Sequence, residues 1–278
     1  MKVIENQTFS KERDFYGSEN VKLINCSFKG IEDGESAFKE AKNIVIESCN
    51  WELRYPFWHD KKLVINNTTL TSSCRAALWY SNDITITNSN LHGIKALREC
   101  NDIIIDNCDI ISPEFGWFNN NLKITNSYAT GEYFVMRSNN LTFENLTLNG
   151  KYSFQYIENA TFVNCNLNTK DAFWHGKNIM VKDCVVKGEY LAWYSENLTF
   201  INCKIIGTQP LCYCKNLKLI DCEMFDCDLS FEKSSVEANI INEIISIKNP
   251  ISGQITVKGV NELIMDDISS TCKIKVEK

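Results

Sequence analysis

Apolar and polar residues alternate in short runs of four or five along most of the chain. In the run that starts at Asn178, the apolar residues Ile179 and Val181 stand one and three places after the start. Alternation with a period of two predicts β-strands, and no stretch shows the 3.6-residue period of a helix. The same run starts again at Asn20, Asn43, Lys62, Asp83, Asp102, Asn121, Asn140, Asn159, Asn197 and Asn216.

These runs recur at a nearly constant interval. From Asp83 to Asn216 every step is 19 residues, and the three earlier steps are 23, 19 and 21. A period of this length over seven consecutive steps indicates a solenoid, in which each repeat forms one coil. Stacked coils place equivalent side chains in columns about 4.8 Å apart.

Each coil also carries a turn signal five residues after its start. Asn or Asp stands there in nearly every coil, as in Asn88, Asn107 and Asn126. These residues tolerate the left-handed backbone region and bond their own backbone, so they suit a sharp bend between two strands. The next position is small or sulfur-bearing, and seven of the thirteen cysteines fall in this one column.

The period distinguishes between types of solenoid. Hexapeptide repeats give coils of about 18 residues and pentapeptide repeats give coils of about 20, so a 19-residue coil fits neither. The sequence therefore predicts an all-β, single-stranded right-handed parallel β-helix that forms a single domain over residues 1–278, with about ten coils. Residues 20–235 form the regular coils, 1–19 an N-terminal cap, and 236–278 irregular C-terminal coils or a cap.

The composition argues against some partners and indicates where the protein is located. The net charge is −6 without a basic run, which argues against binding to nucleic acid or an anionic membrane surface. No apolar stretch reaches the roughly 20 residues of a membrane helix, and the N-terminus has no apolar signal region. We expect a cytoplasmic protein whose cysteines are free and pack as small apolar residues. The Cys212-x-Cys214 pair leaves metal binding as a minor alternative.

The segment before each new coil start has a different character, because it concentrates aromatic and ionisable residues. Five of the six tryptophans share one column: Trp58, Trp79, Trp117, Trp174 and Trp193. The next position forms a mixed column: Glu40, His59, Tyr80, Glu99, Phe118, Arg137, Tyr156, His175, Tyr194 and Tyr213. Four places earlier lies another: Tyr55, Lys95, Glu114, Tyr133, Tyr152, Asp171, Tyr190 and Gln209. Strand alternation favours the two polar columns outside and the tryptophan column inside, which would leave Phe57, Phe154 and Phe173 outside.

Two interpretations of this segment compete. In the first, stacked aromatic side chains simply cover one face of the β-helix. In the second, the face binds an extended carbohydrate-like ligand, with flat rings against the sugars and charged groups supplying directed bonds. The second interpretation includes polysaccharide lyase or glycoside hydrolase activity as a hypothesis. A non-catalytic protein-interaction scaffold is the alternative, and the sequence leaves open whether the protein is an enzyme.

The best candidate site runs from Arg54 to Glu114. The candidate catalytic residues are Glu99, Glu114 and His59. The candidate ligand-binding residues are Arg54, Tyr55, Trp58, Arg75, Trp79, Tyr80, Lys95, Arg98, Trp117, Asp171 and His175. No Walker, Rossmann, G-x-S-x-G or H-E-x-x-H pattern occurs and no cluster of aspartates suggests calcium, so the sequence predicts no metal site and identifies no cofactor. The expected partner is a carbohydrate or another small extended ligand, and the oligomeric state is left open.

Several strings resemble a known family. They are Arg54-Tyr55-Pro56-Phe57-Trp58-His59, Cys74-Arg75-Ala76-Ala77-Leu78-Trp79-Tyr80, His92-Gly93-Ile94-Lys95-Ala96-Leu97-Arg98-Glu99, Pro113-Glu114-Phe115-Gly116-Trp117, Lys170-Asp171-Ala172-Phe173-Trp174-His175 and Gly207-Thr208-Gln209-Pro210-Leu211-Cys212-Tyr213-Cys214. They are similar to a mostly bacterial family of unknown function, placed among the pectate-lyase-like right-handed β-helices. The resemblance implies the fold and a site in the aromatic segment, and it implies no reaction.

Overall fold

The computed structural model describes residues 1–30 and 35–277. The chain is an all-β parallel β-helix of about 14 turns with about 19 residues per turn, as the repeat predicts. About ten coils is therefore too low a count, because strands also form before residue 20 and after residue 235. The described residues contain no helix, so none is available to cross a membrane. Residues 1–141 and 142–278 form two compact units.

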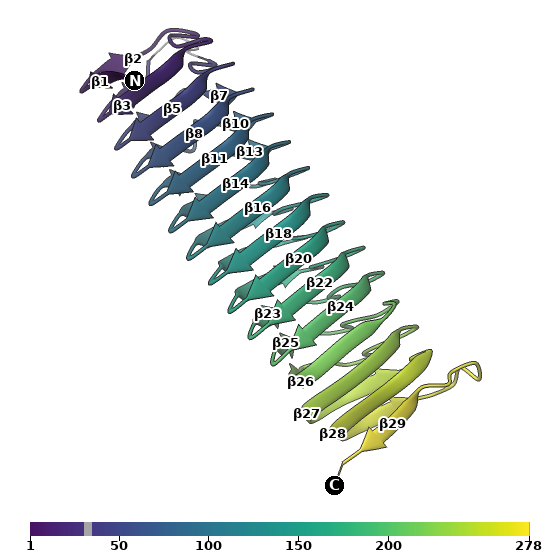
Figure 1. Cartoon of the computed structure of the whole chain (residues 1–278). Coiled ribbons are helices and arrows are strands. Elements are labelled where there is room, and N and C mark those ends of the chain that lie inside the picture. The colour runs from purple at the N-terminus through teal and green to yellow at the C-terminus, as the bar shows by residue number, and fades with distance from the viewer. Residues whose placement is uncertain (31–34, 278) are drawn as a thin grey trace. The chain divides into compact units, whose positions relative to one another are not determined.

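Unit 1 contains three parallel stacks of strands, and the members of the first stack lie side by side in chain order (Figure 1). The first stack is β1 (Lys2–Glu5), β3 (Glu19–Ile24), β5 (Lys42–Glu47), β8 (Lys61–Asn66), β11 (Asn82–Thr87), β14 (Asn101–Asp106) and β16 (Asn120–Thr125). The second is β2 (Thr8–Phe9), β4 (Ser27–Phe28), β6 (Asn50–Trp51), β9 (Thr69–Leu70), β12 (Asn90–Leu91), β15 (Asp109–Ile111) and β17 (Tyr128–Glu132). The third is short: β7 (Phe57–Trp58), β10 (Leu78–Trp79) and β13 (Leu97–Arg98).

Unit 2 repeats the first two stacks. The first is β20 (Glu158–Val163), β22 (Lys177–Lys182), β24 (Glu196–Ile201), β26 (Leu217–Phe225), β27 (Ser235–Lys248), β28 (Ser252–Ile264) and β29 (Lys273–Val276). The second is β19 (Thr147–Lys151), β21 (Asn166–Lys170), β23 (Val185–Lys187) and β25 (Lys204–Ile206), and its coils join the long strand β26. β18 (Asn139–Glu144) contains the boundary between the units.

The register of the strands explains the alternating sequence pattern. In unit 1, Ile84 of β11 pairs with Leu63 of β8 and Ile103 of β14, and all three side chains are buried. Inward apolar residues of successive coils thus contact one another and form one continuous core. Equivalent rings also stack inside, as in Phe28 and Trp51, whose ring centroids lie 3.6 Å apart.

The asparagine turns have the predicted conformation. Asn25, Asn67, Asn88, Asn107 and Asn126 all have φ between 48° and 52°, in the left-handed region that asparagine tolerates. The side chains add bonds between coils, since Asn107 Nδ2 donates to Asn88 Oδ1 over 2.8 Å. The turn signal in the sequence therefore marks one corner of nearly every coil.

The cysteines are free, and all are buried except the partly exposed Cys272, which confirms the expected packing role. Their thiols face backbone carbonyls, as when Cys203 Sγ donates to Val181 O over 3.3 Å. Burial raises the pKa of Cys108 to about 11 and that of Cys214 to about 12. Such thiols are poor nucleophiles at neutral pH.

Candidate functional site

The aromatic segment of each coil has its own backbone geometry. In the coil of β7, Tyr55 and His59 both have positive φ values, of 56° and 63°, and only Phe57 and Trp58 between them are extended. Both left-handed residues donate their amides to the next coil, Tyr55 to Arg75 O over 3.1 Å and His59 to Trp79 O over 3.0 Å. These bonds between coils support a backbone conformation that would otherwise cost each non-glycine residue about 1–2 kcal/mol.

This geometry overturns the predicted orientation of the columns. The tryptophan column does not face the core: Phe57 is fully buried, Trp58 is half-buried and His59 is exposed. Phe154 and Phe173, predicted to lie outside with Phe57, are fully buried in unit 2. The prediction assumed that strand alternation continues through the segment, whereas the left-handed residue after each tryptophan interrupts it. The tryptophan column and the polar column beside it therefore both face outward.

The indole groups donate hydrogen bonds to the neighbouring coil. In unit 1, Trp58 Nε1 donates to Ala76 O over 2.7 Å, and Trp79 and Trp117 make the same bond to Lys95 O and Tyr133 O over 2.8 Å. Trp174 and Trp193 repeat it in unit 2. Each acceptor carbonyl belongs to a residue in the left-handed region. Each of these tryptophans thus connects its coil to the next, which is a structural role of the kind that the first interpretation expected.

One cation interrupts the tryptophan column of unit 1. Trp58 and Trp79 stack with centroids 5.0 Å apart, and the Arg98 guanidinium carbon lies 5.2 Å from the ring centroids of both Trp79 and Trp117. Cation–aromatic contacts of this kind each contribute about 0.5–1 kcal/mol at partly exposed sites. Arg98 Nε is 3.5 Å from Glu99 Oε1. Arg98 is therefore a mostly covered cation between two indole rings: its side chain is 23% exposed, and its Nε is sealed from solvent without a hydrogen-bond partner.

The column beside it, which we name the outer column, consists in unit 1 of Glu40, His59, Tyr80, Glu99, Phe118 and Arg137. The His59 and Tyr80 rings stack with centroids 4.9 Å apart and an interplanar angle of 14°. Tyr16 donates its hydroxyl hydrogen bond to Glu40 Oε2 over 2.8 Å. Because the His59 and Tyr80 rings cover one another's faces, this pair presents mainly ring edges and a hydroxyl group to a ligand, beside the charged Glu40 and Glu99. The predicted stacking of sugars on flat ring faces does not fit these stacked rings.

The structure brings together many of the predicted site residues, but not all of them. The ring centroids of Tyr55 and Trp58 lie 5.3 Å apart, and Lys95 Nζ lies 3.3 Å from Glu114 Oε2. Arg54 pairs with Glu35 over 2.8 Å, and Arg75 is exposed. Asp171 and His175 belong to unit 2.

His175 lies in a second stack of rings. In unit 2 its ring lies between those of Tyr156 and Tyr194, at 4.9 and 5.2 Å, and Tyr213 continues the stack at 4.8 Å from Tyr194. Trp174 and Trp193 stack beside them at 5.5 Å. Unit 2 thus presents an aromatic face of the same kind as unit 1.

The catalytic roles predicted for Glu99, Glu114 and His59 stay predictions. Glu99 and Glu114 each pair with a neighbouring cation, and His59 stacks on Tyr80. The described residues contain no group of three or more His, Cys, Asp or Glu side chains that could hold a metal ion.

Sequence reasoning missed a column of polar side chains just behind this face. Asp60 Oδ1 accepts a hydrogen bond from Ala41 N over 2.8 Å, and Asn119 Oδ1 accepts one from Cys100 N over the same distance. Burial raises the pKa of Asp60 to about 8. The signal was available, since Asp60, Ser81, Cys100, Asn119 and Ser138 each follow a residue of the outer column.

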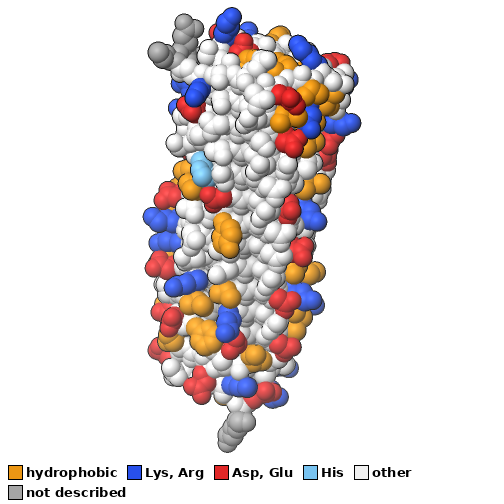
Figure 2. Space-filling view, turned by 90° about the vertical axis from the view of Figure 1, so that its left-hand side faces the viewer, with side chains coloured by type: hydrophobic (Ala, Val, Ile, Leu, Met, Phe, Trp, Pro, Cys, Tyr) orange, Lys and Arg blue, Asp and Glu red, His pale blue; other side chains and the backbone are white. Residues whose placement is uncertain are grey.

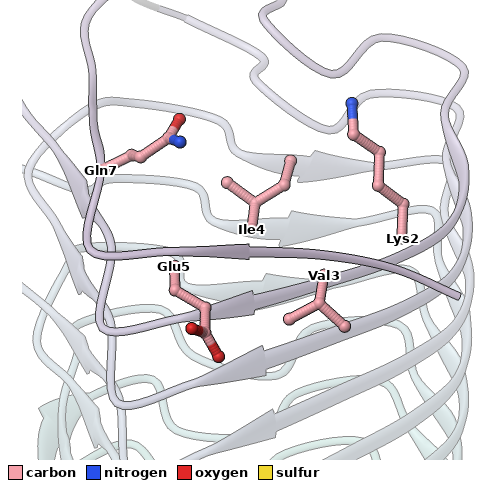
Figure 3. A pocket seen from close by; sticks show the side chains of 5 residues that line it. All are labelled: Lys2, Val3, Ile4, Glu5 and Gln7. Atoms are coloured by element: carbon pink, nitrogen blue, oxygen red, sulfur yellow. The ribbon is translucent and has the colours of Figure 1, made fainter.

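Other features of the surface lie away from the aromatic segment. One pocket lies along β1, where Lys2, Ile4 and Gln7 point to one side of the strand and Val3 and Glu5 to the other (Figure 3). None of these residues belongs to the aromatic segment. Figure 2 shows charged side chains of both signs interspersed with hydrophobic ones on the face that it presents.

The fold and this repeated aromatic face define the protein as a parallel β-helix with outward columns of ionisable and aromatic residues. The chain matches, over residues 2–277, the model of a family described as a protein of unknown function (DUF3737), and it belongs to that family. No curated protein shows significant sequence similarity to it.

Solved structures with a similar fold include two mannuronan C-5 epimerase modules and an endopolygalacturonase. The mannuronan C-5 epimerase AlgE4 A-module of Azotobacter vinelandii is 8% identical, covering 99% of this chain and 89% of that one, with a TM-score of 0.40. The AlgE6 A-module is 8% identical, covering 98% and 87%, with a TM-score of 0.42. Endopolygalacturonase I of Stereum purpureum is 12% identical, covering 99% and 95%, with a TM-score of 0.33.

Proposed function

We propose that the outer column of unit 1 binds an extended, polyhydroxylated ligand of the carbohydrate class. The observation that carries this proposal is the run from the exposed His59 through the half-buried Tyr80 to the half-buried Glu99, beside Arg98. These residues supply an imidazole, a phenol, a carboxylate and a guanidinium on adjacent coils. Sugar hydroxyls both donate and accept hydrogen bonds, so an alternation of donors and acceptors matches them better than it matches an apolar ligand.

The spacing of the groups supports an extended ligand. Successive coils lie about 4.8 Å apart, so a chain-like molecule that runs along the column meets one new polar group per coil. Because the ring faces are covered by their neighbours, binding depends on hydrogen bonds at ring edges. Pre-ordered side chains lower the entropy lost on binding, and the stacked rings and the Arg98 contacts supply that order.

Substitution of Tyr80 by phenylalanine tests this proposal. The change removes one hydroxyl group and keeps the ring that stacks on His59. We expect the dissociation constant for an oligosaccharide that binds the wild type to rise about threefold to tenfold, the loss of one hydrogen bond. Isothermal titration calorimetry with a panel of neutral and acidic oligosaccharides measures it.

Tyr128→Phe is the matched control, because Tyr128 is a 67%-exposed tyrosine of unit 1 on strand β17, away from the aromatic segment. It should leave the affinity unchanged. Equal losses in both variants, or no binding by any oligosaccharide of the panel, would overturn the proposal and favour the interaction scaffold. For any ligand that binds, product analysis with Glu99→Gln and Glu114→Gln decides whether lyase or hydrolase activity accompanies binding.

A further inference from the structure

Asp171 of unit 2 is a buried carboxyl group without a partner. The residue is 5% exposed, and its side chain makes no hydrogen bond or ion pair with the described residues. Only its backbone is engaged: the amide donates to Glu189 O over 2.9 Å, and the carbonyl accepts from Gln155 Nε2 over 3.2 Å. Unlike Asp60, whose Oδ2 is sealed from solvent, the Asp171 carboxyl retains contact with solvent. A ligand at the surface can therefore reach it.

The neighbouring cation, Lys170, already contacts other groups. Lys170 Nζ lies 2.9 Å from Glu189 Oε2 and 5.1 Å from the centroid of the Tyr190 ring. It acts on Asp171 through space without bonding to it. With Asp171 ionised, the two carboxylates outweigh the one ammonium, so the immediate surroundings favour a cation over an anion.

None of the described residues donates a hydrogen bond to the carboxyl oxygens of Asp171. An ionised carboxylate offers about four acceptor positions, and leaving them empty in a mostly buried group is costly. Burial raises the pKa of Asp171, Lys170 lowers it, and Glu189 raises it again. A ligand that brings N–H donors with a positive charge would satisfy these oxygens and offset the cost of burial.

We propose that Asp171, with the Lys170–Glu189 pair and Tyr190 beside it, forms a binding site for a primary ammonium group, such as that of an amino sugar. An ammonium group supplies three donors and the charge that the site lacks. The Tyr190 ring adds an aromatic wall, since it packs edge-on against Trp193 at 5.2 Å and so has a fixed orientation. This site is separate from the outer column of unit 1 and does not depend on the function proposed there.

The test compares three sugars that differ at a single group: glucosamine, N-acetylglucosamine and glucose. Titration into the full-length protein at neutral pH is followed by amide chemical-shift changes and by calorimetry. We expect glucosamine to shift the amides of Lys170, Asp171 and Tyr190, and N-acetylglucosamine and glucose to bind at least about tenfold more weakly. Equal binding of all three sugars, or no binding of glucosamine, would overturn the ammonium site.

Asp171→Asn keeps the shape of the side chain and removes its charge, so we expect it to weaken glucosamine binding about tenfold or more. Asp226→Asn is the matched control, because Asp226 is an exposed aspartate of unit 2 with the same left-handed conformation. Unchanged circular dichroism and melting temperature would show that both variants fold. If Asp226→Asn weakens binding as much as Asp171→Asn, general electrostatic attraction explains the effect and the proposed site is wrong.

Discussion

Substitution of Phe57 by alanine is expected to lower the free energy of unfolding by about 3–5 kcal/mol. The Phe57 ring is fully buried, and its centroid lies 4.8 Å from that of Trp51 and 5.9 Å from that of Phe38. Removing it leaves a cavity in a core where each coil packs only on its neighbours, so little else can fill the space. Urea denaturation followed by circular dichroism measures the loss.

His59→Asn is the control two residues away. His59 is exposed and has a φ of 63°, which asparagine also tolerates, so its unfolding free energy should change by less than about 0.5 kcal/mol. If His59→Asn were the more damaging change, Phe57 would not face the core and the orientation of the whole aromatic segment would be wrong.

Substitution of Asp60 by asparagine is expected to stabilise the protein at neutral pH. The Asp60 side chain is fully buried, and its Oδ2 has no hydrogen-bond partner. Asn119 shows that an asparagine fits this column. Its Oδ1 accepts a hydrogen bond from Cys100 N, just as Asp60 Oδ1 accepts one from Ala41 N. Asn119 Nδ2 has no hydrogen-bond partner, like Asp60 Oδ2. The variant therefore keeps the hydrogen bond and removes a group that is costly to ionise.

The effect depends on pH in a defined direction. Burial raises the pKa of Asp60 to about 8 in the folded protein, whereas it is about 4 in an unfolded chain. The folded state therefore binds the proton more tightly, and the wild type loses stability as pH rises from about 4 to about 8. The advantage of Asp60→Asn should grow from near zero at pH 4 to the order of 4 kcal/mol at pH 7.

Denaturation midpoints of the wild type and Asp60→Asn between pH 4 and pH 9 provide the measurement. Asp83→Asn is the control, because it makes the same replacement at an exposed aspartate of the same unit. A difference for Asp60→Asn that stays constant over this range would mean that Asp60 is ionised in the folded protein throughout.

Particular residues show how much of the candidate site could be predicted from the sequence. The columns themselves followed from counting, since Trp58, Trp79 and Trp117 occupy the same position of their coils. The hydrogen bonds from these indoles to carbonyl groups could not be predicted in this way. Their acceptors are backbone atoms of Ala76, Lys95 and Tyr133, which have unrelated side chains. The isolation of Asp171 was also hidden, because an unsatisfied group is recognised only when its surroundings are known.

The sequence by itself determined the coil. Apolar residues at a fixed period can all be buried only if the chain returns to the same inward positions in every turn, and asparagine marks the left-handed corner because it tolerates that conformation. The tertiary structure alone decided which columns face solvent. At Tyr55 and His59 the left-handed conformation is supported by hydrogen bonds from the backbone amides to the next coil rather than by the side chain. The residue type at these positions therefore does not predict it.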